Sequence, residues 1–291
     1  TIKPSLVLKP NDVILVIGKP DVLMQVYNVI GKTQGQFPMP FGRNIYLYLD
    51  LYLQNDVSIK KAIDEAKYLN QKLKNNLLIV RITRPTTVQI MDYIKEELKH
   101  FPSIILLIDY GNKGFNKIIK EDFRKNNIGM IMLTPEMFKN KENIQSVLDL
   151  KIPIFKFGKE NLKAVKRTVI ILNDTNSYEQ ISPIVFDISS QLKIKTKIFD
   201  LDPVGDKEGK TNLLDHFENL AKIFNEKIEV VTSGQNPIRE LKKQKDMLQL
   251  LPLKEKMFKK RFFFKFLYTN SDFIAFDLNK YNQLLIPIVE E

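Results

Sequence analysis

The sequence has no cysteine, and histidine occurs only twice, as His100 and His216, among 291 residues. The lack of cysteine excludes disulfides, thiolate metal sites and cysteine nucleophiles, and two histidines are too few for a multi-histidine metal site. Glycine is also scarce, and no Gly-x-Gly-x-x-Gly dinucleotide fingerprint is present. We therefore assign no catalytic residue, no metal site and no NAD site, and we expect a protein without enzymatic activity.

Long apolar runs are missing as well. The purely aliphatic stretches, such as residues 104–108, are far shorter than the roughly 18 residues that a membrane-spanning helix needs. The chain begins at Thr1 and shows no signal-peptide pattern. We expect a cytoplasmic fragment of a longer protein.

The composition is that of a folded globular protein, with 44% hydrophobic and 27% charged residues. The net charge of +11 is divided into +8 for residues 1–160 and +3 for residues 161–291. A basic excess spread in this way indicates solubility and a general attraction to anions, and we do not expect nucleic-acid binding. The length is about twice that of a typical domain, which favours two compact units.

From residue 44 onward, apolar runs of strand length alternate with segments of helical periodicity. This alternation predicts an α/β fold with two tandem open, mostly parallel sheets, helices on both faces of each, and a small α+β fragment before them. Ser58 is the expected cap of the first helix, and the strand at 103–109 is expected to be buried on both faces. The expected strands are 44–51, 77–83, 103–109, 128–133, 152–157, 167–172, 194–199, 228–232, 273–276 and 284–289. The expected helices include 86–98, 115–125, 135–148, one ending near Leu192, one spanning Leu213 to Phe224, and one begun by Asn236 and Pro237.

The first segment carries a family resemblance. Leu8, Pro10, Asp12, the apolar run 13–17, Gly18 and Leu23 resemble the closing part of the C-terminal regulatory domain in RCK or Trk-type potassium-transport proteins, with Asn11 where that family usually has glycine. The resemblance implies that residues 1–33 are the tail of such a domain and that 34–43 form a linker. It also implies a homodimer that contacts a membrane transporter or channel subunit at the inner membrane.

The two α/β units, predicted at 44–160 and 161–291, resemble the universal stress protein architecture. The strongest match is the end of the strand at 167–172, which is followed by Asp174, Thr175 and Asn176. In ATP-binding members of that family an aspartate at this place contacts the nucleotide, so the resemblance implies an adenine nucleotide as ligand. The phosphate-binding glycine run of those members is missing from both units.

Ligands of open parallel sheets bind beyond the carboxyl ends of the strands, and one such loop contains Arg81, Arg84, Thr86 and Thr87. Two arginines close to a helix start predict an anion site, whereas the alternative is that the arginines are solvated and the threonines cap the helix.

Residues 254–266 combine six basic residues with five phenylalanines. Within this stretch Lys259, Lys260, Arg261 and Phe262 are the expected contacts with a partner surface. Stacking on single-stranded nucleic acid and contact with anionic lipid are the alternatives.

The sequence therefore favours a regulatory, non-catalytic cytoplasmic portion of a bacterial potassium or other cation transport protein. The alternative is a free-standing nucleotide-binding protein of the universal stress type.

Overall fold

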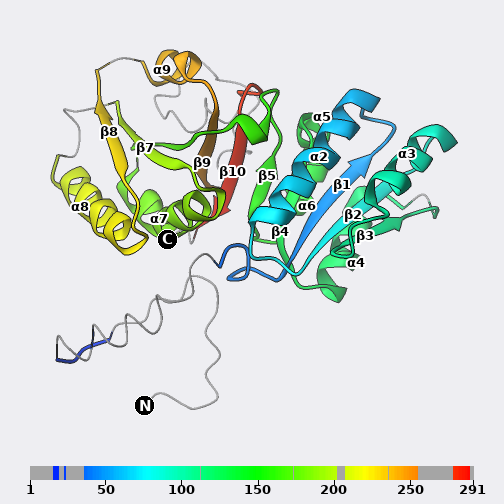
Figure 1. Ribbon diagram of the computed structural model, residues 1–291, viewed down its shortest axis with the longest axis horizontal. Helices are drawn as coiled ribbons and strands as arrows, with labels where there is room; N and C mark the ends of the chain where they lie inside the picture. Colours follow the sequence, from blue (N-terminus) through cyan, green and yellow to red (C-terminus); the bar gives the residue numbers. More distant parts are fainter. Residues whose placement is uncertain are drawn as a thin grey trace.

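The computed structural model describes residues 16–19, 23, 36–111, 113–172, 174–201, 207–234, 236–254 and 278–288. Strands and helices alternate from residue 44 onward, as predicted (Figure 1). Residues 44–160, called the first half below, form β1 (Asn44–Asp50), α2 (Asp56–Lys72), β2 (Leu77–Arg84), α3 (Val88–Leu98), β3 (Ile104–Ile108), α4 (Phe115–Lys125), β4 (Ile128–Leu133), α5 (Pro135–Lys139), α6 (Lys141–Leu148) and β5 (Ile154–Lys156).

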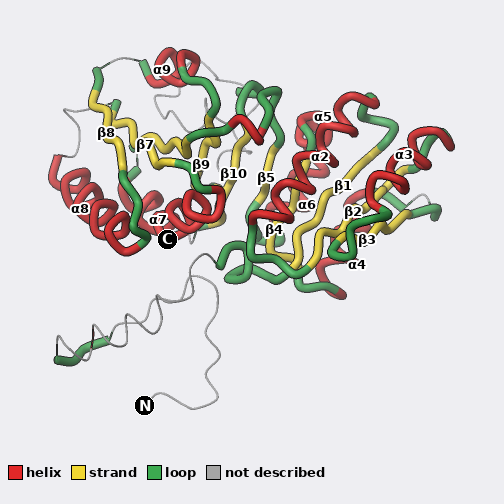
Figure 2. Tube along the Cα trace, in the orientation of Figure 1, coloured by secondary structure: helices red, strands yellow, loops and turns green. Residues whose placement is uncertain are grey.

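Residues 161–288, called the second half, repeat this alternation, and Figure 2 shows the same succession of helix and strand in both halves. The elements are η1 (Leu162–Ala164), β6 (Arg167–Ile171), α7 (Thr175–Leu192), β7 (Lys195–Asp200), α8 (Lys207–Ile223), β8 (Ile228–Thr232), α9 (Pro237–Lys243), β9 (Met247–Leu253) and β10 (Asn282–Pro287).

The strands form one sheet in the order β3-β2-β1-β4-β5-β10-β9-β6-β7-β8. Neighbouring strands within each half are parallel, whereas β5 and β10 are antiparallel, with Leu284 opposite Phe155. The predicted α/β class with mostly parallel strands is confirmed. The structure differs from the prediction in one respect, because the strands of the two halves belong to a single sheet.

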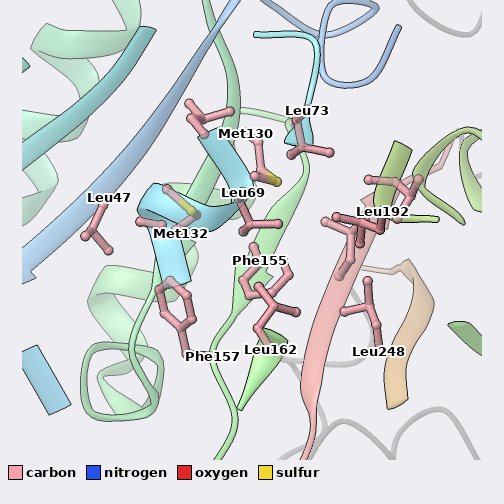
Figure 3. Close-up of a cluster of buried hydrophobic side chains, with 14 of the residues drawn as sticks. Leu47, Leu69, Leu73, Met130, Met132, Phe155, Phe157, Leu162, Leu192 and Leu248 are labelled. Carbon is pink, nitrogen blue, oxygen red and sulfur yellow. The ribbon is translucent and has the colours of Figure 1, made fainter. Parts of the chain in front are cut away.

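Helices cover both faces of this sheet, as predicted. Side chains of β1 alternate between the faces: Ile45, Leu47 and Leu49 lie in a core with α2, α3, α7 and α8, whereas Tyr46 and Tyr48 lie in a second core with α4, α5, α6 and α9. The first core is continuous across the junction of the halves. Figure 3 shows part of it, with Leu69 and Phe155 from the first half and Leu192 and Leu248 from the second.

Two local features differ from the predictions. Asn55, not Ser58, caps α2, because the Asn55 Oδ1 accepts the backbone N–H of Ser58 at 2.8 Å. The single helix expected over 135–148 is divided into α5 and α6 at Asn140, whose side chain accepts the N–H groups of Glu142 and Asn143.

Strand β9 was not predicted. Its sequence is rich in leucine and contains Gln249 and Pro252, none of which favours a strand, yet β9 lies between β10 and β6 and is buried throughout. Strand β3 is less buried than predicted, because it forms one edge of the sheet and leaves Ile105 40% exposed. The strand expected at 273–276 lies outside the described residues.

A buried polar row crosses the junction of the halves. The Lys156 Nζ of β5 donates to the Gln283 Oε1 of β10 at 3.0 Å, and the Gln283 Nε2 donates to the Gln249 Oε1 of β9 at 2.8 Å. All three side chains are at most 2% exposed. The Lys156 ammonium group also lies over the ring of Phe138, 5.2 Å from its centroid. This polar row fixes the pairing of β5, β10 and β9 in an otherwise apolar layer.

The described part of the predicted linker packs against α7. Phe37 is fully buried, and the backbone N–H groups of Gln36 and Phe37 both donate to the Asp187 Oδ2 at 2.8 Å. The Gln191 side chain donates to the Phe37 carbonyl at 3.0 Å and accepts the Lys74 N–H at 2.7 Å. Helix α7 therefore holds together the segment before β1 and the turn after α2.

Candidate functional site

The candidate site follows from the direction of the strands. Because β5 and β10 are antiparallel, the carboxyl ends of the first-half strands and of the second-half strands lie at opposite ends of the sheet. In open α/β sheets ligands bind at the carboxyl ends of the strands, in the crevice between two neighbouring strands whose following connections run to opposite sides of the sheet. The strand order places these points between β1 and β4 in the first half and between β6 and β9 in the second.

The first-half edge contains Arg84, one of the residues predicted to bind an anion. Its Nη2 lies 2.6 Å from the Asp50 Oδ2, its Nε donates to the same oxygen at 2.8 Å, and its guanidinium lies over the ring of Tyr52. The Asp50 carboxylate is buried and also accepts the Tyr52 N–H at 3.1 Å. The charge of Arg84 is thus already balanced by a carboxylate.

Arg81 lies apart from Arg84, on the sheet face covered by α4. Its Nε is 3.2 Å from the Asp122 Oδ2, which also accepts the Tyr48 hydroxyl at 3.1 Å. Burial raises the pKa of the Asp122 carboxyl, and the Arg81 charge offsets part of that rise. Burial and the Asp122 charge hold the pKa of Tyr48 well above its ordinary value. Arg81 therefore stabilises a buried cluster beneath the sheet.

Thr86 and Thr87 are exposed in the turn before α3, and the Thr87 side chain makes no capping hydrogen bond. The structure does not bring these threonines and the two arginines together around one point. The anion site at these residues stays a prediction that the geometry does not support.

Two pairs of hydrogen-bonded side chains lie at the first-half crevice, between β1 and β4. The Gln54 Nε2 donates to the Thr134 Oγ1 at 2.6 Å, and both residues are buried. The Ser58 hydroxyl donates to the Glu136 Oε2 at 3.1 Å, which places a carboxylate in the first turn of α5. A carboxylate at this helix start would repel a phosphate, so the first-half crevice is poorly suited to a nucleotide.

The second-half crevice is built differently. Asp174 caps α7, and its carboxylate accepts the Ser177 N–H at 3.2 Å and the Ser177 hydroxyl at 2.9 Å. The same carboxylate forms an ion pair with Lys254, the residue directly after β9. Burial alone would raise the pKa of Asp174, but the hydrogen bonds from Lys254 and Ser177 outweigh it and lower that pKa.

Asp174 and Lys254 therefore face each other across the point between β6 and β9. Thr175 is half-buried and Asn176 is exposed in the first turn of α7, next to this pair. Asp174, Thr175 and Asn176 are predicted site residues, whereas in the sequence Lys254 is only the first residue of a basic stretch. No local pattern joins Lys254 to Asp174, because 80 positions separate them.

Two further polar pairs of the second half have no signal in the sequence, because the partners come from different elements. At the end of β7, Asp200 pairs with Lys210 of α8 at 3.0 Å, and both side chains are nearly buried. The Ser182 Oγ of α7 lies 2.9 Å from the His216 Nε2 of α8. Ser182 is fully buried and donates to the Glu179 carbonyl at 2.6 Å, so a substrate cannot reach this hydroxyl. The serine and histidine join two helices.

Some predicted contacts lie outside the described residues. These are Lys259, Lys260, Arg261 and Phe262, and most of residues 1–33, which carry the potassium-transport resemblance. Within the described ranges, no three His, Asp or Glu side chains gather as they would around a metal ion. No described helix has the length and apolar character that are needed to cross a membrane.

Comparison with known proteins gives results only at the level of structure. No protein-family model matches the sequence, and no curated protein matches it. A universal stress protein from Archaeoglobus fulgidus DSM 4304 superposes with a TM-score of 0.51 at 13% identity, over 84% of this chain and 96% of that one. A functionally unknown protein from Pseudomonas aeruginosa PAO1 superposes with a TM-score of 0.54 at 11% identity, over 84% of this chain and 92% of that one.

These likenesses establish the fold. The chain has an α/β fold similar to that of a universal stress protein, and the match extends over nearly the full length of each neighbour. The predicted resemblance to universal stress proteins is confirmed at this level, and neither neighbour supports a part in potassium transport.

Proposed function

We propose that this chain is a non-enzymatic binding protein of the universal stress type that takes an adenine nucleotide in its second half. The observation that carries the proposal is the meeting of Asp174 and Lys254 between β6 and β9. A carboxylate accepts hydrogen bonds from an amino or hydroxyl group, and an ammonium group binds phosphate. This crevice therefore offers both kinds of group that a nucleotide requires.

The start of α7 adds to this arrangement. Thr175 and Asn176 occupy its first turn, where backbone N–H groups and the helix dipole favour a negative charge. Without a ligand, Lys254 is paired with Asp174. A bound phosphate would compete with the Asp174 carboxylate for the Lys254 ammonium group.

The described residues of the first half offer no equivalent site. At the corresponding place Gln54 and Thr134 bond to each other, and Glu136 brings a negative charge to the start of α5. We therefore propose one crevice of this kind per chain. The phosphate-binding glycines of ATP-binding family members are missing, so binding would depend on Lys254 more than on backbone N–H groups.

A part in potassium transport, contact with a transporter and homodimer formation remain predictions of the resemblance in residues 1–33. The described residues and the structural neighbours leave them untested.

Isothermal titration calorimetry with ATP, ADP and AMP tests the proposal. Lys254→Gln removes the charge and keeps most of the side chain, so affinity for the tightest nucleotide should fall about tenfold or more. Lys197→Gln is the matched control, because Lys197 also forms an ion pair, with Glu229, in the same half. If no nucleotide binds, or if both variants bind as the wild type does, the proposal is wrong.

A further inference from the structure

The stretch of sequence that begins with α9 is strongly basic. Residues 236–266 contain ten Lys or Arg and three Asp or Glu, which gives a net charge of +7 out of +11 for the chain. Of this stretch the structure describes residues 236–254, which comprise α9, the turn after it, β9 and Lys254. The positive charge of residues 161–291 is therefore concentrated in one stretch of the sequence, and within the described part of that stretch Arg239, Lys242 and Lys243 lie on α9.

One side of α9 borders a cavity of about 670 Å³, lined by Asn236, Arg239, Lys242 and Lys243. This volume is within the roughly 300–1,000 Å³ that small-molecule sites occupy. Lys243 pairs with Glu240 at 2.5 Å. In the part of the chain that the structure describes, no ion pair involves Arg239 or Lys242, so two of the three cations lack a counter-charge.

The neighbouring structure holds α9 in place. The Tyr281 hydroxyl donates to the carbonyls of Leu241 at 2.6 Å and Gln244 at 3.0 Å, and the Lys280 Nζ also donates to the Gln244 carbonyl. At the other end of α9, the Asn236 Oδ1 accepts the Arg239 N–H at 3.2 Å. A helix of seven residues needs such support, and these bonds fix the direction of the cationic side.

This cavity is separate from the pair formed by Asp174 and Lys254. Leu241 of α9 is buried in the core that also contains α4, α5 and α6, whereas α7 lies on the opposite face of the sheet.

We propose that the cavity beside α9 binds a small polyanion carrying two or more phosphate groups. A guanidinium group binds a phosphate through two parallel hydrogen bonds, and a lysine binds phosphate as a point charge. Arg239 and Lys243 are one helical turn apart and Lys242 is next to them, so the three cations can meet adjacent phosphates of one molecule. A singly charged anion would leave one of the two uncompensated cations unmatched. The hollow is open to solvent, so a nucleic-acid strand is the competing ligand that the test has to distinguish from a small polyanion.

Calorimetric titration of the full chain with inorganic triphosphate tests this proposal. The double variant Arg239→Gln/Lys242→Gln should raise the Kd for triphosphate at least roughly tenfold. Lys245→Gln is the matched control, because Lys245 is an exposed lysine two residues after α9 that does not line the cavity. The control should bind triphosphate with a Kd within about threefold of the wild-type value. All three changes are at exposed positions, so melting temperatures should stay close to that of the wild type.

Two further measurements distinguish the site at α9 from the nucleotide site and from a nucleic-acid site. Triphosphate binding should persist in Lys254→Gln. AMP has a single phosphate and does not match the cations at α9, so its affinity should fall in Lys254→Gln and not in Arg239→Gln/Lys242→Gln, which makes the two results independent. A fluorescent single-stranded oligonucleotide of about 20 nucleotides tests the nucleic-acid alternative. The proposal is overturned if triphosphate does not bind at saturable 1:1 stoichiometry, or if Lys245→Gln weakens it as much as the double variant does. It is also overturned if the oligonucleotide binds through Arg239 and Lys242 and triphosphate does not displace it.

Discussion

Gln283→Leu should be among the most destabilising single substitutions at the junction of the two halves. Gln283 accepts a hydrogen bond from the Lys156 ammonium group and donates one to the Gln249 carbonyl oxygen, with all three side chains buried. Leucine has nearly the same volume but can make neither bond. In the variant, the buried Lys156 ammonium group would lose a hydrogen-bond acceptor, and the buried Gln249 side-chain oxygen would lose its donor.

The expected loss can be estimated from these two bonds. A hydrogen bond to a charged group contributes about 1.5–3 kcal/mol, and a buried acceptor left without a donor costs about 1–3 kcal/mol. The free energy of unfolding should fall by about 3–5 kcal/mol, which corresponds to a decrease in Tm of roughly 5–8 °C for a chain of this size. Urea denaturation followed by far-UV circular dichroism measures the change.

A second variant tests the physical cause. Replacing the whole polar row, as Lys156→Met/Gln249→Leu/Gln283→Leu, removes the buried charge together with its partners and should recover at least half of the lost stability. Gln145→Leu, at an exposed position on α6, is the control and should change stability by less than about 0.5 kcal/mol. The reasoning is refuted if Gln283→Leu costs less than about 1 kcal/mol, or if the triple variant is less stable than the single one.

Two further predictions concern pH and close packing. Burial raises the pKa of Glu226 from 4.5 to about 7, so the folded protein binds an extra proton between these pH values and loses stability as the pH rises through them. After allowance for solvent screening at this half-buried site, the loss should be about 1–2 kcal/mol. Urea denaturation at pH 5 and pH 8 should show that Glu226→Gln no longer loses this stability with rising pH. If the variant depends on pH as the wild type does, Glu226 is not the group responsible. Gly158→Ala should lower stability by about 2–4 kcal/mol, because the new Cβ would stand 2.2 Å from the Tyr281 carbonyl carbon. A Tm within about 2 °C of the wild-type value would show that the backbone moves apart there at little cost.

The alternation of elements could be predicted from the sequence because aliphatic strands and amphipathic helices leave local patterns. Strand β9 left none, since Gln249 and Pro252 interrupt a leucine-rich run that resembles no half-buried strand. Its place in the sheet depends on contacts with β10 and β6, which are distant in sequence. The two halves form one sheet because β5 pairs with β10, and a pairing between strands so far apart in the sequence leaves no periodic pattern.

The candidate site was predicted in part for a similar reason. Asp174 was predicted because the end of the strand at 167–172 resembles the segment of universal stress proteins that contacts the nucleotide, whereas its partner Lys254 is brought to it only by the pairing of β6 with β9. Arg81 and Arg84 are close in sequence, but each binds a carboxylate that sequence analysis did not associate with it, Asp122 and Asp50. Spacing along a strand does not show which side chains neutralise each other.

Because the two halves belong to one chain, substitutions can change the crevice of one half without changing the crevice of the other. In a symmetric dimer of separate single units, every substitution appears twice, so a change that closes one crevice also closes the other. Here the antiparallel pair of β5 and β10 joins the two halves within one chain. The residues at the crevice of each half are therefore encoded only once. Gln54 and Glu136 can obstruct the first-half crevice while Asp174 and Lys254 keep the second one charged. Because the two halves of this chain are encoded separately, a change in one crevice leaves the other crevice unaltered.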